Sequence, residues 1–516
     1  MHHSARQSCP DSARPARARR WLAALLAVWL PLAQGSAWAA DSLPELGASS
    51  LSPQQELQLG RDVMRQIRSQ GGVVDDPLLT EYLNAIGDRL VAASGDQGQH
   101  FDFFLVKDDS INAFALPGGY IGVNYGLWLQ TSNESELAGV MAHEVAHVTQ
   151  HHIARQYQAS KGMGLKTLAA ILGAVLIGAS GKGGPDAAQA AVAAATAGSI
   201  QQQIDYTRAN EYEADRVGIG ILAAAGYDPQ GMVDFFKLME QRFHFETANL
   251  PEFMSNHPLS THRITEAAER ARRLSQGPYR ESRQYGIMCA RLRVLASNNL
   301  QDVYAHFAAG ARDDASLSER YGRALAAIRL DRHQEATRLM QALVKEAPDT
   351  IAFHIGLAEA QFGADEPGAA MQTAEKAREL FPDNIPLLLE SADLALKTDH
   401  AEHARQLLSS HLERADTHPD IYRHLARAES QLGNQGSSHY RMDQYYEALD
   451  EIHEAAAQIR LALRQNDLDP VQQARYKATL DRLAKRVKEL DREQSRQQNG
   501  AGLRATQERA LGSPRW

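Results

Sequence analysis

Apolar residues between Ser52 and Ser94 follow a helical pattern. Leu59, Val63 and Ile67 are four residues apart, and most other apolar positions of the segment lie three or four residues from the next. This is the period of a helix with one buried face. The sequence therefore predicts helices over residues 52–94.

The pattern then changes to that of short strands. Residues 101–106 are mostly aromatic or apolar, and residues 112–124 contain two short apolar runs on either side of Pro117-Gly118-Gly119. Proline and glycine in this arrangement favour a tight turn between strands. We expect one strand followed by a hairpin.

Helical spacing returns over residues 134–156, with Ser132 or Asn133 as the N-cap. Residues 162–200 then carry few charges, and Leu165 to Ala179 is almost wholly apolar. That run is shorter than the roughly 20 residues of a membrane-spanning helix. Two interpretations stay open: a helical hairpin that covers a site or lies on a membrane surface, or a buried helix pair in the core.

Beyond Pro278 the chain repeats with a period near 34 residues. Small residues in register let paired helices approach closely, and prolines in register end the second helix of each pair. The pattern resembles the tetratricopeptide repeat, and an ordinary helical bundle is the alternative. The positions in register are Pro348 and Pro382; Ala324, Ala358 and Ala392; and Ala336, Ala370 and Ala404.

The repeats extend towards the C-terminus. Pro419 and the segment Ala426 to Ala448 indicate a further unit with an insertion, and Pro470 begins a long polar helix suited to capping the stack. Residues 493–516 are polar, and we expect a disordered tail there. The predicted fold is mostly α with a small β-sheet, and an α-solenoid of repeats occupies residues 317–492.

The composition is that of a globular protein large enough for two or three domains. Of the 516 residues, 44% are hydrophobic and 23% are charged, which excludes wholesale disorder and a polytopic membrane protein. The formal net charge is -9, and no stripe of lysine and arginine occurs beyond the N-terminus. Nucleic acid is therefore not an expected partner.

Residues 1–39 have the features of an export signal. Arginines at positions 14, 17, 19 and 20 precede the apolar run Trp21 to Leu30, and Ala37-Trp38-Ala39 has the form of a cleavage site. A membrane anchor is the alternative, but the run is short for one. After cleavage Cys289 is the only cysteine, which excludes an intrachain disulfide and a zinc site of several cysteines, and its apolar neighbours favour burial.

The sequence His143-Glu144-Val145-Ala146-His147 lies in the predicted helix. Positions i and i+4 share a helix face, so both imidazoles can bind one metal ion. A catalytic zinc has three protein ligands and an open position for water, whose pKa it lowers to about 7. We expect Glu144 to take the proton of that water.

A downstream acidic pair offers the third ligand. Glu211 and Asp215 are one turn apart in a segment with helical spacing. We expect Glu211 to bind the metal and Asp215 to accept a hydrogen bond from the outer nitrogen of a zinc histidine. Glu213 points to another face and is left out of the ligand set. A solvated acidic helix face is the alternative.

These motifs resemble those of the metallopeptidase family that includes the HtpX heat-shock protease and the CAAX prenyl protease, and above all its periplasmic members with tetratricopeptide repeats. The resemblance implies a zincin-type peptidase domain at residues 40–275, connecting helices at residues 276–316 and one Zn²⁺ per chain. It rests on four motifs: Asn112-Ala-Phe-Ala-Leu-Pro-Gly-Gly, His143-Glu-Val-Ala-His147, Arg208-x-x-Glu211-x-Glu-Ala-Asp215 and Ser255-Asn-His-Pro-Leu259.

The resemblance adds His257, which matches a loop histidine near the metal. It implies that His257 either fills the open coordination position in a resting state, as a fourth ligand, or steadies the oxyanion. A surface histidine is the alternative. His151, His152 and His262 have no comparable match, and we expect them to be structural or solvated, with a peripheral contact to His147 open to His151.

Asn112, Ala113, Phe114 and Ala115 are expected to form an edge strand that pairs with the backbone of an extended substrate. The whole pattern predicts an exported zinc metalloendopeptidase with client-binding repeats. The resemblance implies a periplasmic location, clients among outer-membrane β-barrel proteins or their assembly machinery, and a peripheral membrane contact. The alternatives are an assembly chaperone or adaptor with a structural or latched metal site, and a membrane-embedded protease that uses the apolar run after residue 164 as a span.

Overall fold

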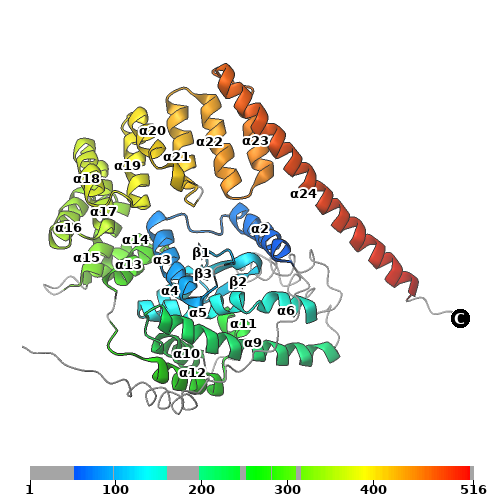
Figure 1. Cartoon of the computed structure of the whole chain (residues 1–516). Helices are drawn as coiled ribbons and strands as arrows, with labels where there is room; N and C mark the ends of the chain where they lie inside the picture. The colour runs from blue at the N-terminus through cyan, green and yellow to red at the C-terminus, as the bar shows by residue number, and fades with distance from the viewer. Residues whose placement is uncertain are drawn as a thin grey trace, which may run out of the picture. The chain divides into compact units, whose positions relative to one another are not determined.

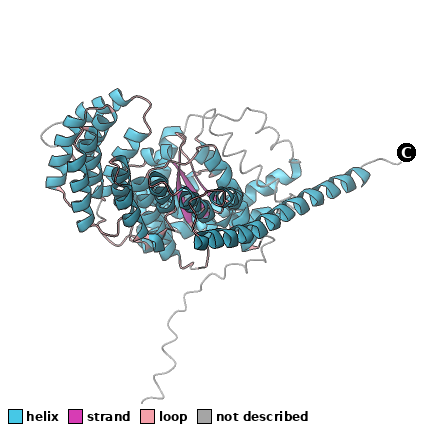
Figure 2. Ribbon diagram, turned by 90° about the horizontal axis from the view of Figure 1, so that it is seen from above, coloured by secondary structure: helices cyan, strands magenta, loops and turns pink. Residues whose placement is uncertain are grey.

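The computed structural model describes residues 52–96, 98–159, 197–243, 251–279, 282–309, 315–415 and 417–511. These residues are mainly helical with one small sheet (Figures 1 and 2), so the predicted fold class is confirmed. The export signal expected at residues 1–39 and the apolar run Leu165 to Ala179 lie outside them. Within the described ranges, no helix combines the length and the apolar character needed to cross a bilayer.

Two helices open the described chain, α2 (Pro53–Ser69) and α3 (Pro77–Ser94). Ser52 accepts a hydrogen bond from the amide of Gln55, and Asp76 accepts one from the amide of Leu79. Both caps satisfy amides that the first helical turn leaves without partners. The buried side chains include those that set the helical spacing: Leu59, Val63, Ile67, Leu83, Ile86 and Leu90.

The sheet has three strands in the order β1-β3-β2 within the described residues. They are β1 (Asp102–Val106), β2 (Ala113–Leu116) and β3 (Tyr120–Asn124), with the short 3-10 helix η1 (Pro117–Gly119) between the last two. β1 runs parallel to β3, and β2 runs antiparallel to it, which confirms the predicted hairpin. A Cβ atom on Gly119, whose φ is +82°, would lie 1.7 Å from the carbonyl oxygen of His100, so this turn requires glycine.

The segment predicted as one helix, residues 134–156, is helical as expected except at residues 150–151, where a break divides it into two helices. After α4 (Tyr125–Gln130), helix α5 (Glu134–Thr149) begins at the N-cap Asn133 and ends before a break, and α6 (His152–Ala159) is a separate helix. His151 lies at the break with a φ of +52°, a left-handed conformation that an α-helix does not contain. The polar residues at the break do not interrupt the apolar spacing, so the pattern did not reveal it.

Helix α5 is packed between the sheet and the helices that follow. These are α9 (Ala197–Ala224), α10 (Gln230–Phe243), α11 (Glu252–Asn256) and α12 (Thr261–Leu274), of which α9 and α10 contact α5 (Figure 1). A Cβ atom on Gly218 of α9 would lie 3.0 Å from the carbonyl oxygen of Ala142 in α5. Glycine at this position therefore lets the two helices that carry the candidate ligands approach closely.

Helices α13 (Arg283–Leu295) and α14 (Leu300–Ala309) fall where connecting helices are expected. Arg291 of α13 donates to Asp76 (2.8 Å) and to the hydroxyl of Tyr321 (2.9 Å), and all three side chains are buried. Cys289 on the same helix is only partly buried, and this burial raises the pKa of its thiol.

Successive helix pairs then repeat as the sequence predicts. The first three pairs begin at residues 317, 351 and 385, one period of 34 apart, and the six alanines in register are all buried. The helices are α15 (Leu317–Arg329), α16 (His333–Glu346), α17 (Ile351–Gly363), α18 (Pro367–Leu380), α19 (Ile385–Lys397), α20 (Ala401–Ser409), the 3-10 helix η2 (Leu412–Arg414), α21 (Asp420–Gln431), α22 (Gln435–Ala448), α23 (Ile452–Ala462) and α24 (Pro470–Leu511).

The turns inside the pairs repeat as well. Asp331, Asp365 and Asp399 all have a positive φ near 60°, and Gly433 has one of +85° at the next period. Aspartate and glycine tolerate this left-handed conformation better than most residues. The turn chemistry is therefore part of the 34-residue repeat, although only the prolines and alanines revealed the repeat in the sequence.

Helix α24 continues through residues 493–511, for which the sequence predicts a disordered tail. The segment is rich in glutamine, arginine and alanine, which have high helix propensity.

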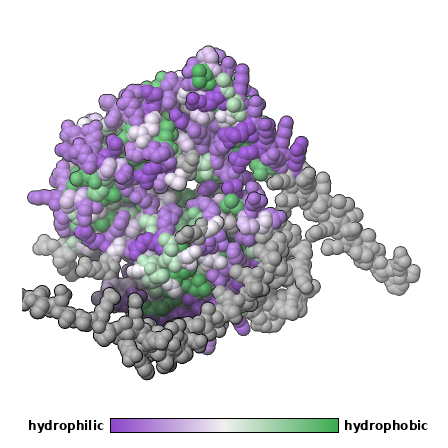
Figure 3. Space-filling model, in the orientation of Figure 1, coloured by the Kyte–Doolittle hydropathy of each residue, from purple (hydrophilic) through white to green (hydrophobic). Residues whose placement is uncertain are grey.

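The visible face of the molecule is mostly hydrophilic (Figure 3). Among the described residues, the large apolar side chains that are exposed are Leu380, Leu461 and Val471.

Candidate metal centre

Helix α5 places two histidines at one point. His143 and His147 are one turn apart, and their Nε2 atoms lie 3.0 Å from each other. His143 is completely buried, and His147 is partly buried. The spacing of four residues thus directs both rings to the same side of the helix.

Glu211 reaches this point from α9. Its two carboxylate oxygens lie 3.4 Å from the Nε2 atoms of His143 and His147, one oxygen for each ring. Burial by itself raises the pKa of Glu211, but the charge of His257 and hydrogen bonds from the histidines hold that pKa well below its usual range. Glu211 is therefore anionic at neutral pH.

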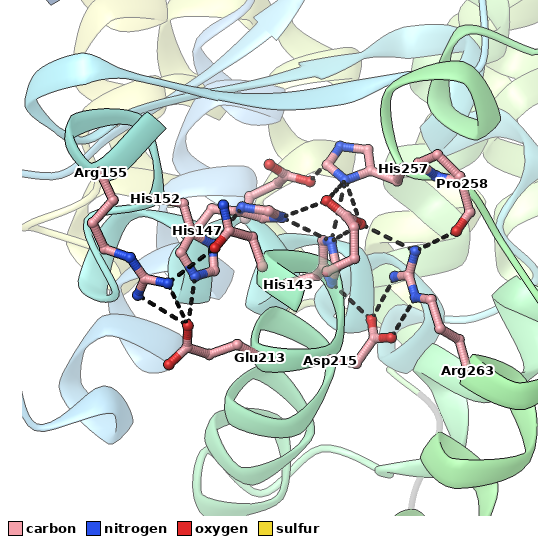
Figure 4. Close-up of polar contacts among 12 residues, drawn as sticks. His143, His147, His152, Arg155, Glu213, Asp215, His257, Pro258 and Arg263 are labelled. Atoms are coloured by element: carbon pink, nitrogen blue, oxygen red, sulfur yellow. Dashed lines mark hydrogen bonds and ion pairs between the residues drawn. The ribbon is translucent and has the colours of Figure 1, made fainter. Parts of the chain in front are cut away.

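His257, at the C-terminal end of α11, completes the cluster. Its Nδ1 atom lies 3.1 Å from Glu211 Oε2 and 3.2 Å from His143 Nε2. The candidate ligand atoms of His143, His147, Glu211 and His257 all lie within 4.8 Å of one another (Figure 4). His257, which only the sequence resemblance pointed to, is thus one of the four candidate metal ligands of this cluster.

The donors of this cluster fit a divalent metal ion. Nδ1 of His143 faces the carboxylate of Asp215 at 3.0 Å, so a neutral His143 carries its proton there and presents a lone pair at Nε2. Burial lowers the pKa of His143, but Asp215 and Glu211 raise it to about 10. The surroundings therefore favour a positive charge at this point, which a bound cation supplies to neutral imidazole and carboxylate ligands.

Arg263 is a member of the site that sequence reasoning missed. It donates to both oxygens of Asp215 (2.7 and 2.8 Å) and to the carbonyl of Pro258 (2.8 Å), and it lies 3.1 Å from Glu211. Burial raises the pKa of Asp215, but Arg263 and His143 lower it below its ordinary value. One signal was available: Arg263 falls on the face of α12 that carries the buried Ala267 and Ala271, where a charge needs a partner.

His151 and His152, which follow the motif, lie in different surroundings. Because the chain turns at His151, it is His152 whose Nδ1 lies 2.8 Å from Nδ1 of His147. His152 is buried, and its burial together with His147 lowers its pKa to about 3. His151 instead lies beside Gln99, and the contact with His147 that the sequence leaves open to His151 is made by His152.

His262 is 3.0 Å from the hydroxyl of Tyr212 and does not belong to the ligand cluster. Glu213, left out of the ligand set, contacts His152 and Arg155 instead. Glu144 is buried beside the cluster, 3.5 Å from Nε2 of His257. The oxygen that faces this ring is Oε1, which has no hydrogen-bond partner among the described residues, so it is available to a proton.

The predicted substrate strand lies at the edge of the sheet. Ala113, Phe114 and Ala115 are in β2, which among the described strands pairs with β3 alone, while Asn112 precedes the strand and is buried. β2 also contacts helix α5. The carbonyl of Ile111 accepts a hydrogen bond from the amide of Phe253, so the segment that carries His257 is attached at the start of this edge.

Comparison with known proteins adds independent information. Residues 77–271 match the sequence model of peptidase family M48. The beta-barrel assembly-enhancing protease of Escherichia coli (strain K12) is 32% identical over 455 residues, 86% of this chain and 91% of that protein. A Vibrio cholerae serotype O1 protein provisionally given the same name is 35% identical over 450 residues, 86% of this chain and 92% of its own.

A more distant likeness covers the peptidase part alone. The mitochondrial metalloendopeptidase OMA1 of Schizosaccharomyces pombe is 26% identical over 220 residues, 42% of this chain and 60% of that protein. The two bacterial proteins, in contrast, are similar to this chain over most of its length, so their likeness extends into the repeats.

Proposed function

This chain belongs to peptidase family M48 and is a metalloprotease, and we propose that it is a zinc endopeptidase whose metal is bound by His143, His147 and Glu211. The observation that carries the proposal is the convergence of two imidazole Nε2 atoms, 3.0 Å apart, with a buried anionic carboxylate 3.4 Å from each. Two histidines and one glutamate are a common ligand set for catalytic zinc. We therefore propose one zinc ion per chain.

Glu144 is the general base of the proposed reaction. Bound zinc supplies the Lewis acidity that makes water nucleophilic at neutral pH. Glu144 is buried at the edge of the cluster, and its Oε1 atom has no partner among the described residues. We assign it the proton of the attacking water, which it later gives to the leaving amine. Asp215 supports the reaction indirectly, because it holds the ring of His143.

His257 acts as a latch on this site. Its ring contacts both Glu211 and Glu144, and His257 is among the candidate ligands. A histidine at this position fills the fourth coordination place, where water must otherwise bind. The arrangement therefore corresponds to a resting state. A latched site also supports the second candidate function, an assembly adaptor, since such a protein does not need to cut its client.

Replacing His257 by Ala should increase the cleavage of casein. The expected rise is about tenfold, which corresponds to an open form that makes up roughly a tenth of the parent molecules. The measurement is the initial rate per zinc-loaded molecule, with His262→Ala as the control because His262 lies outside the cluster. A fall in rate would show that His257 assists the reaction, and an unchanged rate would remove it from the site.

The substrates of the proposed peptidase are extended polypeptides. A peptide that adds to the free edge of β2, along Asn112 to Ala115, is held through its backbone and passes beside the motif helix α5. Recognition of this kind reads main-chain groups and tolerates many side chains. It therefore selects unfolded chains, as quality control requires.

We further propose a periplasmic location and clients among outer-membrane β-barrel proteins and their assembly machinery. The names of the two bacterial relatives support such clients, and the arginine-rich, then apolar N-terminal segment supports export. The helix pairs after residue 317 supply a surface on which a protein partner can be held while the peptidase domain cuts.

Metal analysis combined with casein cleavage tests the function. The purified protein should carry one zinc per chain and cleave casein, an unfolded substrate, while a folded globular protein of similar size stays intact. Glu211→Ala should lose both zinc and cleavage. His257→Ala is measured in parallel, because activity that His257 suppresses in the parent would be detected in this variant. Absence of zinc from the folded parent would overturn the proposal, and equal cleavage of the folded protein would contradict recognition by strand addition.

A further inference from the structure

A second chain of polar contacts leads away from the outer nitrogen of His147. Nδ1 of His147 is 2.8 Å from Nδ1 of His152, whose Nε2 is 3.1 Å from Oε2 of Glu213. Arg155 donates to the same oxygen through both terminal nitrogens, at 2.9 and 3.0 Å. Figure 4 shows these four side chains in sequence on the side of the site opposite Arg263.

The carboxylate fixes the direction of these hydrogen bonds. Glu213 as a carboxylate only accepts, so Nε2 of His152 donates to it. A neutral imidazole has a single N–H, and Nδ1 of His152 must then accept from Nδ1 of His147. His147 is left with its lone pair on Nε2, which faces His143 and Glu211. This is the tautomer that a metal ligand requires.

The two histidines of the motif are therefore supported in the same way. Nδ1 of His143 faces Asp215, and Arg263 donates to Asp215. Nδ1 of His147 faces His152, which donates to Glu213. Arg155 donates to Glu213 in turn. We propose that His152 and Glu213 form a relay that positions His147 for metal binding. This inference rests on the proposed metal site.

The left-handed turn at His151 makes the relay possible. The turn separates α5 from α6, which starts at His152. The side chain of His152 therefore faces His147 of the motif. Arg155, one turn into α6, also donates to the carbonyl of Gln150 (3.3 Å) and to Asn210 of α9 (2.9 Å). These contacts hold the relay between the end of α5 and the helix that carries Glu211.

Substitutions of His152 test the relay through zinc affinity, measured on the purified protein by competition with a chelator of known affinity. His152→Leu removes both hydrogen bonds, and we expect zinc binding to weaken by about 10- to 100-fold. In His152→Asn the amide oxygen is two bonds from Cβ, as Nδ1 is in histidine, so it can still accept a hydrogen bond from His147. This variant should therefore keep most of the zinc affinity that His152→Leu loses.

The matched control is His151→Asn, which changes the neighbouring histidine to a residue that tolerates a positive φ. It should bind zinc like the parent. Glu213→Ala should weaken binding only a few-fold, and the double variant His152→Leu/Glu213→Ala should lose no more than His152→Leu, because the two residues act in series. Thermal unfolding of the zinc-free variants verifies that each one is folded.

Two results would overturn the relay alone: a folded His152→Leu variant that binds zinc as tightly as a zinc-binding parent, or a His152→Asn variant as weak as His152→Leu. If His152→Leu does not fold, His152→Asn decides: a folded His152→Asn variant that loses about tenfold or more in zinc affinity would contradict the relay, because its amide oxygen can still accept from His147. A folded parent that binds no zinc would instead overturn the proposed function and the relay with it.

Discussion

Replacing Glu144 by Gln should abolish proteolysis and leave the metal bound. The amide has nearly the shape of the carboxylate, so the buried surroundings of residue 144 need not change, but it cannot accept a proton. General acid–base catalysis contributes about 100- to 10,000-fold to such reactions, and kcat for casein should fall by a factor in this range. The zinc content should stay at one per chain.

Glu136→Gln is the matched control, because it makes the same change in a buried glutamate of the same helix outside the cluster. It should keep most of the activity. Retention of full activity by Glu144→Gln would exclude Glu144 as the base. Glu144→Gln also distinguishes the peptidase from the assembly adaptor. If this inactive variant supports client assembly in cells as fully as the parent, the adaptor function is favoured.

The parts of the site that could be predicted are those encoded by spacing along one helix. His143 and His147 share a face because their positions are four apart, and the same holds for Glu211 and Asp215. Such relations depend on helix geometry alone. The sequence does not show that α9 approaches α5 closely enough to join the pairs, which depends on packing at Gly218.

The parts that could not be predicted depend on contacts between segments or on one unusual backbone angle. Arg263 reaches Asp215 from α12, far along the chain. His152, and not His151, contacts His147 because the chain turns at the positive φ of His151. Hydrophobic periodicity reports the faces of helices and not their ends, so it predicts neither contact.

The repeats were predictable for the opposite reason. Each pair of helices buries small residues against its neighbours, and the same requirement returns every 34 residues, so weak local signals add up over several units. The polar C-terminal segment after residue 492 lacks such repetition. Its helix-forming composition was the only signal of the extension of α24.

Replacing Arg263 by Met should destabilise the protein by roughly 3–5 kcal/mol, the usual cost of removing one partner from a buried ion pair. Arg263 is 2% exposed and contacts two carboxylates, those of Asp215 and Glu211. Methionine fills similar space without a charge, so both carboxylates lose the guanidinium that is paired with them. The measurement is the free energy of unfolding of the zinc-free protein in urea.

Arg270→Met is the control on the same helix. Its ion pair with Glu266 is 3.6 Å long and partly exposed, with side-chain exposures of 32% and 40%, so its loss should change the unfolding free energy by no more than about 1 kcal/mol. Equal effects of Arg263→Met and Arg270→Met would show that the buried pair does not stabilise the fold. Zinc affinity should fall only in Arg263→Met, because Asp215 then no longer holds His143 in place.

A double variant separates stability from metal binding. Arg263→Met/Asp215→Leu replaces both partners by apolar side chains, and such replacements of a buried ion pair are often neutral or stabilising. The double variant should therefore recover much of the lost unfolding free energy. Its zinc affinity should stay low, since Nδ1 of His143 has lost its acceptor. Recovery of both properties would mean that Asp215 and Arg263 serve the fold alone, whereas recovery of stability without zinc affinity assigns the pair to the metal centre.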